Sequence, residues 1–362
     1  MLEMDIKLLP LQGATAPTRD TQGVASLALG YVLHWAFSPP LLNPKLQLVY
    51  IILCMSLLTG FIGFCNLLYT DFSNLQSPKK MNNLIIRALT GAVFVAVLVG
   101  CTLFSSTTFV LLFAIITGLT TWEFSANVNR YAGASVNKLI NSVAAVYLFI
   151  AFAGYCADFV PSRAFVPYLV SIIYLLVGEL YLKKDDPLKN WGFAFASQVY
   201  VALAFSMLNV LAFQFDPFTN RTQFTPIIPL SVFLFLWTSD TGAYCCGSLL
   251  HKRFPAKLFE RISPNKSWVG SIGGGVLCLV VAAVLWYFNQ TLLSLPEWLG
   301  LGLTVCVFGT WGDLVESLFK RKLGIKDSGR ILPGHGGMLD RFDSSLLAIP
   351  ATVLYLYTIA NF

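Results

Sequence analysis

The sequence predicts an all-α, polytopic integral membrane protein with about nine or ten transmembrane helices, since a helix crosses a bilayer with roughly 20 apolar residues and many such runs are present. Of the 362 residues, 56% are hydrophobic and 12% are charged, with a mean hydropathy of +0.69. Soluble proteins average about 25% charged residues. The apolar runs are continuous rather than alternating, which favours helices over the strands of a barrel.

The N-terminal part of the chain is expected to precede the main series of helices. Residues 1–23 are polar and lack the basic start, apolar core and cleavage site of a signal peptide, which indicates a surface tail. The run 24–42 is interrupted by a histidine and two prolines and is a weak span or an interfacial segment, whereas 46–68 is a clear span. Residues 1–80 therefore form an N-terminal extension with one or two membrane segments.

From residue 81 the chain divides into N-terminal transmembrane helices at 81–215 and a catalytic transmembrane region at 216–362. Residues 214–226 are rich in turn formers and are expected to be a loop. Residues 250–268 hold five Lys or Arg against one acid, and such a basic loop indicates the cytoplasmic side. Spans are expected at residues 84–104, 107–124, 139–156, 165–182, 193–213, 227–237, 269–288, 298–311 and 345–360.

Two pairs of acids stand out in the polar stretch near the C-terminus. If the helix at 298–311 continues, Asp313, Glu316 and Lys320 share one face, which suits either phosphate chemistry or a simple intrahelical ion pair. Asp340 and Asp343 are also three residues apart, after a glycine-rich turn. Paired carboxylates suit Mg²⁺, which prefers oxygen ligands. The alternative is a helix start that favours acids in its first turn.

Two earlier segments carry further polar groups. Asp240 and Tyr244 lie on one face of a helix if the run at 227–237 continues, and they fit a ligand site or a bundle-stabilising aspartate. Ser263 and Lys266 precede a glycine-rich helix start, where backbone N–H groups and an ammonium bind phosphate. A snorkelling lysine beside a small-residue packing face is the alternative.

Together these segments place acids for a metal and basic groups for phosphate near one membrane face. This combination is typical of phosphoryl or nucleotidyl transfer, in which Mg²⁺, Lys and Arg neutralise charge. The net charge of +6 is spread over loops between spans, so no nucleic-acid partner is needed to explain it.

The motifs closely resemble one family. From Met81 to the C-terminus the chain resembles the phosphatidate cytidylyltransferase family, also called CDP-diacylglycerol synthase. The preceding motif of the family is matched by Asp240, Tyr244 and Gly247, and its S-P-x-K-[ST]-W-x-G segment by Ser263, Pro264, Lys266, Trp268 and Gly270. The long signature is matched by Ser317, Lys320, Arg321, Lys326, Asp327, Ser328, Gly329, Pro333, Gly334, His335, Gly336, Gly337, Asp340, Arg341 and Asp343.

The resemblance implies a homodimeric enzyme of the bacterial inner (plasma) membrane that joins CTP and phosphatidic acid into CDP-diacylglycerol and pyrophosphate. It implies a metal centre with Mg²⁺ and leaves K⁺ open. By motif position, Asp313 and Asp340 are the catalytic, metal-associated carboxylates and Lys320 contacts phosphate, while Asp240 and Asp343 are added as metal ligands from the residue pattern. Substrate contacts are expected from Tyr244, Ser263, Lys266, Arg321, Lys326, His335 and Arg341.

One position departs from the family, and two other functions fit part of the pattern. Val269 stands where the family usually has an acid, so any contact of that acid is absent or comes from another residue such as Glu260. A CTP-dependent lipid or polyprenol kinase would use similar groups but release CDP. An ion-coupled transporter would place acids at span centres and show repeat symmetry, and neither is evident.

Overall fold

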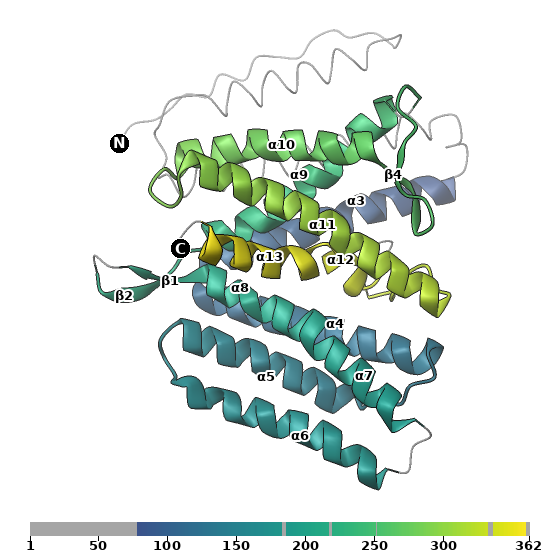
Figure 1. Ribbon diagram of the computed structural model, residues 1–362, viewed down its shortest axis with the longest axis vertical. Coiled ribbons are helices and arrows are strands. Elements are labelled where there is room, and N and C mark those ends of the chain that lie inside the picture. The colour runs from purple at the N-terminus through teal and green to yellow at the C-terminus, as the bar shows by residue number, and fades with distance from the viewer. Residues whose placement is uncertain (1–77, 183–185, 217–218, 251, 332–335, 360–362) are drawn as a thin grey trace. The chain divides into compact units, whose positions relative to one another are not determined.

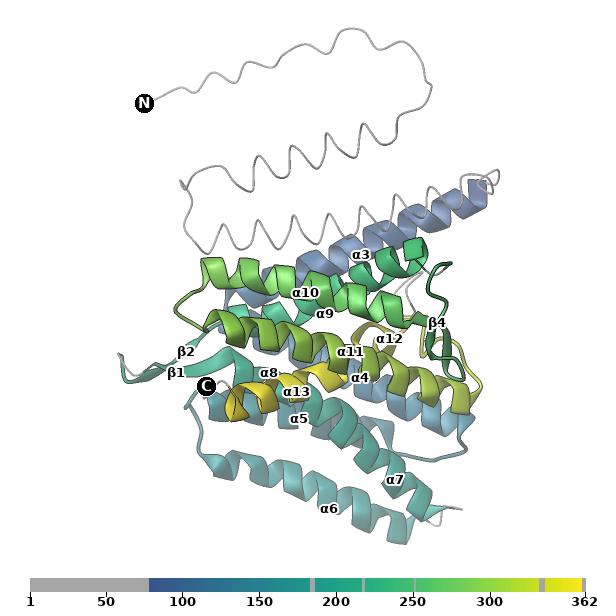
Figure 2. The same ribbon diagram turned by 45° about the horizontal axis from the view of Figure 1, so that its top comes forward.

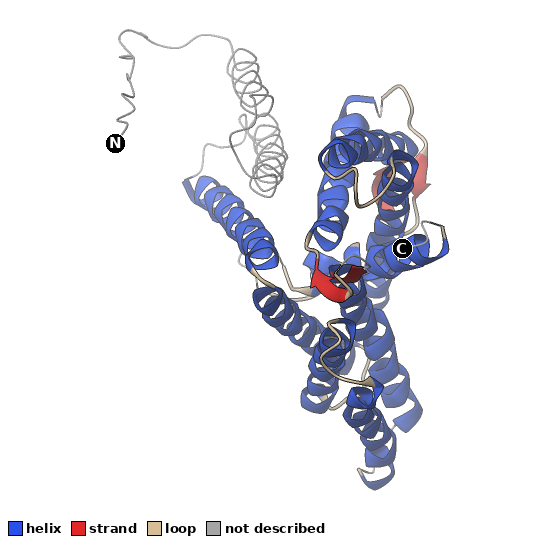
Figure 3. Ribbon diagram, turned by 90° about the vertical axis from the view of Figure 1, so that its left-hand side faces the viewer, coloured by secondary structure: helices blue, strands red, loops and turns tan. Residues whose placement is uncertain are grey.

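The described part of the chain is predominantly helical (Figure 3). The computed structural model describes residues 78–182, 186–216, 219–250, 252–331 and 336–359, with the backbone alone for 78–88. All of them belong to the second of two compact units, Leu48–Phe362. The expected membrane segments at 24–42 and 46–68 lie outside the described residues, as does His335.

The helices follow the predicted apolar runs closely. Six of the described helical segments are long and apolar enough to cross a membrane, judged by length and composition, and the count of about nine or ten stays a prediction. A 3₁₀ turn precedes α6, and a π-helical turn, Gln198–Leu203, joins α7 to α8. The helices are α3 (Pro78–Phe104), α4 (Ser106–Tyr131), α5 (Lys138–Cys156), α6 (Val166–Tyr181), α7 (Pro187–Ser197), α8 (Ala204–Ala212), α9 (Ile227–Leu250), α10 (Trp268–Phe288), α11 (Leu295–Leu323), α12 (Leu339–Phe342) and α13 (Ser345–Thr358).

Two helices continue beyond the ends that hydropathy predicts. The apolar runs end at residues 237 and 311, but α9 continues to Leu250 and α11 continues to Leu323. A polar side chain does not interrupt the i to i−4 backbone hydrogen bonds, so the helix persists where the hydropathy falls. The residues predicted to share a helical face, Asp240 with Tyr244 and Asp313 with Lys320, are therefore on helices.

Two connectors are hairpins, which the expectation of helices alone missed. The turn-rich segment holds β1 (Phe213–Asp216) paired antiparallel with β2 (Arg221–Phe224). The basic loop holds β3 (Lys257–Phe259) paired antiparallel with β4 (Ser263–Ser267). Because β4 ends at the residue that caps α10, this second hairpin fixes the backbone of its basic residues next to a helix N-terminus.

The helices form two neighbouring groups joined through α13. In Figure 1, α4, α5 and α6 lie together, and contacts join α5 to both of its neighbours. On the other side, α10 contacts α9 and α11, and Figure 2 shows α10 and α11 running beside each other. Helix α13 lies between α11 and α8 and contacts both. The C-terminal helix therefore connects the N-terminal bundle to the helices that carry most of the motif residues.

Glycines allow α9 and α10 to approach each other closely. A β-carbon on Gly274 would lie 2.7 Å from the backbone oxygen of Ser239, and one on Gly242 would lie 2.8 Å from Cα of Gly274. Small residues at a helix contact permit this backbone-to-backbone packing in membranes. The contact fixes the part of α9 that carries Asp240.

A buried polar cluster ties the N-terminal helices together. The fully buried Asn141 of α5 donates to Ser125 Oγ of α4 at 2.9 Å and to Ser197 Oγ of α7 at 2.6 Å. Its own side-chain oxygen accepts from Gln198 Nε2 at 2.8 Å. Interhelical hydrogen bonds of this kind stabilise helix association inside a bilayer.

Replacing Asn141 with alanine is expected to destabilise the protein. Three side-chain hydrogen bonds are lost, and membrane hydrogen bonds contribute about 0.6 kcal/mol each on average and at most about 1.7, so the free energy of unfolding falls by roughly 2–5 kcal/mol. Thermal unfolding in detergent measures the effect. Asn289→Ala is the control, because Asn289 donates only within its own helix, to Leu285 O at 3.0 Å. Equal losses from the two substitutions would contradict this role.

Candidate active site

Three aspartates from separate segments gather into one acidic centre, which we define as Asp240, Asp313 and Asp343. The carboxylate of Asp343 interacts electrostatically with those of Asp313 and Asp240, and Asp240 interacts with Asp313. Asp240 comes from α9, Asp313 from α11 and Asp343 from the junction of α12 and α13. Lys266 Nζ, at the end of β4, lies 2.5 Å from Asp313 Oδ2. Three of the four predicted metal-ligating acids are thus brought together beside a predicted phosphate-binding lysine.

The acidic centre depends on a close contact between two backbones. Gly312 precedes Asp313, and a β-carbon there would lie 2.7 Å from the backbone oxygen of Asp343 and 2.8 Å from that of Ser344. Only a residue without a side chain lets α11 approach the α12–α13 junction this closely. The glycine therefore brings Asp313 and Asp343 to the same place.

Burial and mutual repulsion both act on the carboxylates of the acidic centre. Burial raises the pKa of Asp343 to about 7, and the carboxylate of Asp313 adds to the rise. The backbone N–H of Ser344 donates to Asp343 Oδ1 at 2.6 Å and opposes the rise only in part. A cation bound among these carboxylates would relieve the repulsion.

Lys320, Glu316 and Asp340 form a second charged cluster close to the acidic centre. Lys320 Nζ lies 2.7 Å from Glu316 Oε2, one helical turn away, and 2.8 Å from Asp340 Oδ1. Asp340 Oδ2 also accepts the backbone N–H groups of Ser328 and Gly337, each at 2.8 Å. Burial acts to raise the pKa of Asp340, but the hydrogen bond from Lys320 and these amides hold it below the ordinary value. Asp340 is thus an anion whose two oxygens bind Lys320 and the backbone amides of the loop.

The two carboxylates predicted to act together, Asp340 and Asp343, serve different partners. Asp343 belongs to the acidic centre, whereas Asp340 holds Lys320. Within the described residues, no group of three or more His, Cys, Asp or Glu side chains is arranged to hold a metal ion by itself. Metal ligation by the four predicted aspartates and the Mg²⁺ and K⁺ assignments therefore stay predictions.

Two of the predicted substrate-binding residues, Lys266 and Arg341, interact with aspartates of the acidic centre. Lys266 also reaches Thr310 O at 3.5 Å, and Arg341 interacts electrostatically with Asp240. Ser263 is half-buried in β4. The exposed members of the set are Tyr244, Arg321, Lys326 and Arg341.

Val269 marks the position at which the sequence departs from the family pattern. It is half-buried in the first turn of α10, directly after the capping residue Ser267 and the adjacent Trp268. Glu260, the acid suggested as a substitute, is exposed between β3 and β4. That Glu260 replaces the acid that the family usually has at position 269 stays a prediction.

Sequence reasoning missed two residues beside the site. Glu123 of α4 is buried and contacts the loop that carries Asp340, although it was treated as part of an apolar span. Tyr200, on the π-helical turn, interacts electrostatically with Asp343 and Glu316, and its buried hydroxyl has no hydrogen-bond partner among the described residues. The signal that could have identified Glu123 is the presence of an acid within an apolar run, which often marks a functional residue. No sequence pattern announces a single π-helical turn.

Membrane helices that deliver an acidic centre flanked by lysines define a membrane-embedded enzyme that acts on phosphate groups. A model of the cytidylyltransferase family matches residues 85–359. A phosphatidate cytidylyltransferase of Staphylococcus haemolyticus (strain JCSC1435) is 34% identical over 268 residues, which are 73% of this chain and 96% of the relative. One from Staphylococcus saprophyticus is 39% identical over 194 residues, 53% of this chain and 69% of the relative. The chain belongs to the cytidylyltransferase family.

Gly312→Ala is expected to abolish most of the activity while leaving the protein folded. The added β-carbon pushes the backbone at residues 343–344 away, and a misplacement of about 1 Å in a catalytic site can cost roughly 100-fold in rate. The measurements are cytidylyl transfer and thermal unfolding in detergent. Gly192→Ala on α7 is the control, because a β-carbon there would meet no atom within 4 Å. Similar rates for the two variants would argue against the backbone contact.

Proposed function

We propose that this site transfers the cytidylyl group of CTP to phosphatidic acid, giving CDP-diacylglycerol and pyrophosphate for phospholipid synthesis. The observation that carries the proposal is the acidic centre, with Lys266 and Lys320 beside it, inside the region that the family model matches. The curated relatives are named for the same reaction. A membrane-embedded site suits a substrate whose acyl chains remain in the bilayer.

The reaction needs charge neutralisation more than proton transfer. A phosphate oxygen of phosphatidic acid attacks the α-phosphorus of CTP, a new P–O bond forms, and the bond to the β-phosphate breaks so that pyrophosphate leaves. A phosphomonoester is already anionic near neutral pH, so no general base is required. In this proposal, Lys266, Lys320 and Arg341 neutralise the triphosphate and the leaving group.

The residues present fit a magnesium ion. Asp313 offers oxygen donors with Asp240 and Asp343 nearby, and burial, with a smaller part from the Asp313 carboxylate, raises the pKa of Asp343. Mg²⁺ commonly uses one or two carboxylates and completes its shell with waters and substrate phosphates, so a closed protein cage is not expected. When bound, the ion would neutralise phosphate charge. Asp340 contributes through Lys320, and K⁺ is left open.

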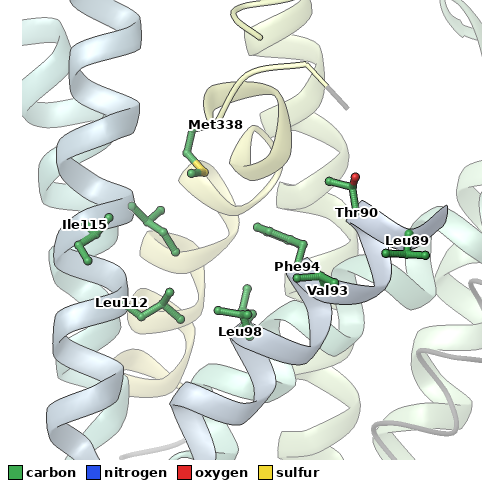
Figure 4. Close-up of a pocket in the computed structure, with 10 residues that line it drawn as sticks. Leu89, Thr90, Val93, Phe94, Leu98, Leu112, Ile115 and Met338 are labelled. Atoms are coloured by element: carbon green, nitrogen blue, oxygen red, sulfur yellow. The ribbon is translucent and has the colours of Figure 1, made fainter. Parts of the chain in front are cut away.

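An apolar groove beside the site supports a lipid substrate. Its volume is about 410 Å³, and Figure 4 shows its lining side chains on α3, α4 and the segment before α12. Several of these side chains are exposed, so the groove opens at the surface, and Met338 lines it two residues before Asp340. An acyl chain in the groove would bring its phosphate toward Lys320. The lining residues are Leu89, Thr90, Val93, Phe94, Val97, Leu98, Leu112, Ile115, Ile116 and Met338.

The finer membrane arrangement is also proposed. The exposed basic residues of the β3–β4 hairpin favour an active site that faces the cytoplasm, where CTP is available. Bacterial relatives support residence in the inner membrane. Six candidate spans leave the count of about nine or ten helices a proposal, and the family resemblance supports a homodimer.

The activity is tested with purified protein, CTP, Mg²⁺ and phosphatidic acid. We expect CDP-diacylglycerol and pyrophosphate in equal amounts, and Asp313→Asn should lower the rate by about 100-fold or more, because a carboxylate that would hold the charge-neutralising Mg²⁺ is lost. Asp158→Asn, which changes an exposed acid in the loop after α5, is the control. Release of CDP with a newly phosphorylated lipid would identify a lipid kinase instead.

The lipid groove is tested by filling it. Val93→Trp is expected to raise the KM for phosphatidic acid several-fold, since the indole takes the space of the acyl chain, while the KM for CTP stays unchanged. Ile173→Trp on α6 is the control, because that side chain is exposed and lies outside the groove. An unchanged lipid KM in Val93→Trp would remove the groove from the proposal.

A further inference from the structure

Glu123 is an acid in the middle of an apolar helix. It lies on α4, a candidate membrane span, and only 5% of the residue is exposed. A carboxylate in such a place is costly unless hydrogen bonds compensate it. Its partners therefore indicate why the chain keeps an acid here.

Among the described residues, the hydrogen-bond partners of the Glu123 carboxylate all belong to the loop that precedes and includes α12. Its Oε2 accepts the backbone N–H of Met338 at 2.9 Å, and its Oε1 accepts that of Leu339 at 3.1 Å. The hydroxyl of Ser328 donates to Oε1 as well. One turn further along α4, Asn127 Nδ2 donates to Ser328 O at 2.7 Å. Two residues on one face of α4 thus hold both described ends of the loop, at 328 and at 338–339.

The same loop ends hold Asp340. The backbone N–H of Ser328 donates to Asp340 Oδ2, and Ser328 Oγ accepts the N–H of Asp340 at 3.3 Å. A β-carbon at Gly329 or Gly337 would collide with the Glu123 carboxylate, so both positions fit tightly around it. Asp340 in turn carries Lys320 on its other oxygen. A continuous set of hydrogen bonds therefore leads from Glu123 to Lys320.

We propose that Glu123 is a positioning residue for the cytidylyl-transfer reaction, which holds the loop so that Asp340 keeps Lys320 directed at the substrate phosphates. Glu123 touches no reacting atom in this scheme. It acts by fixing the backbone on which Asp340 and its amide partners depend, and Ser328 transmits the constraint to the other end of the loop. The kinetic part of this inference rests on the proposed function.

Glu123→Gln separates this role from a general contribution to folding. Glutamine keeps the shape but has one acceptor oxygen, and its NH₂ group faces backbone donors, so it cannot accept the three hydrogen bonds. Glu179→Gln is the matched control, because Glu179 of α6 is also a buried acid in a candidate span and accepts from Asn190 Nδ2 at 2.8 Å. Glu123→Asp keeps the charge on a shorter side chain.

Two measurements are made on the full chain in detergent. Hydrogen exchange, read by mass spectrometry, follows the amides at 337–340, and steady-state kinetics gives kcat and the KM for CTP. In Glu123→Gln we expect these amides to exchange at least about 10-fold faster, because hydrogen-bonded protection is lost locally. We also expect kcat to fall by about 10–100-fold, which is typical when a residue that orients a directly contacting group is replaced, with a smaller change in the KM for CTP. Glu123→Asp should recover part of the amide protection and part of kcat.

The outcomes are distinct. Faster exchange confined to the loop, with a lower kcat and near-normal values for Glu179→Gln, supports the proposal. Unchanged loop exchange in Glu123→Gln, or an equal loss of kcat in Glu179→Gln, overturns it. If the unmodified protein makes no CDP-lipid, the proposed function fails, while the exchange measurement still decides whether Glu123 holds the loop.

Discussion

The structure depends on one constraint, which is that each carboxylate carried into an apolar helical bundle must find donors or cations. Most of them do. Glu123 takes backbone N–H groups, while Glu316 and Asp340 share Lys320. In the acidic centre, Lys266 is paired with Asp313 while three carboxylates interact.

Backbone contact, more than side-chain packing, decides where these charges meet. The three acids of the centre come from segments far apart in the sequence, and glycines let their backbones touch: Gly274 against α9 and Gly312 against the α12–α13 junction. Helix association in a bilayer gains little from hydrophobicity, because lipid tails are as apolar as side chains. Close packing and hydrogen bonds such as those of Asn141 must therefore hold the helices together.

The sequence was informative about helices and motif residues and less so about their partners. Hydropathy located the apolar runs, yet α9 and α11 continue beyond them because backbone hydrogen bonds ignore side-chain polarity. Spacing suggested that Asp340 and Asp343 act together, but the partners of each come from distant segments that spacing does not report. Glu123 was overlooked for the same reason, since its hydrogen bonds reach more than 200 residues along the chain.

The π-helical turn at Gln198–Leu203 has a consequence for how the bundle tolerates change. A π turn adds one residue to a helix, and each residue rotates an α-helix by about 100°. Before the turn, Ser197 meets Asn141; after it, the Phe205 ring packs edge-on against that of Phe342, 5.3 Å away. Deleting one residue from the turn would rotate α8 relative to α7 by about 100°. The chain could then keep the Ser197–Asn141 contact or the Phe205–Phe342 contact, but not both. The π-helical turn, which includes Tyr200, therefore sets the rotation of α8 relative to α7.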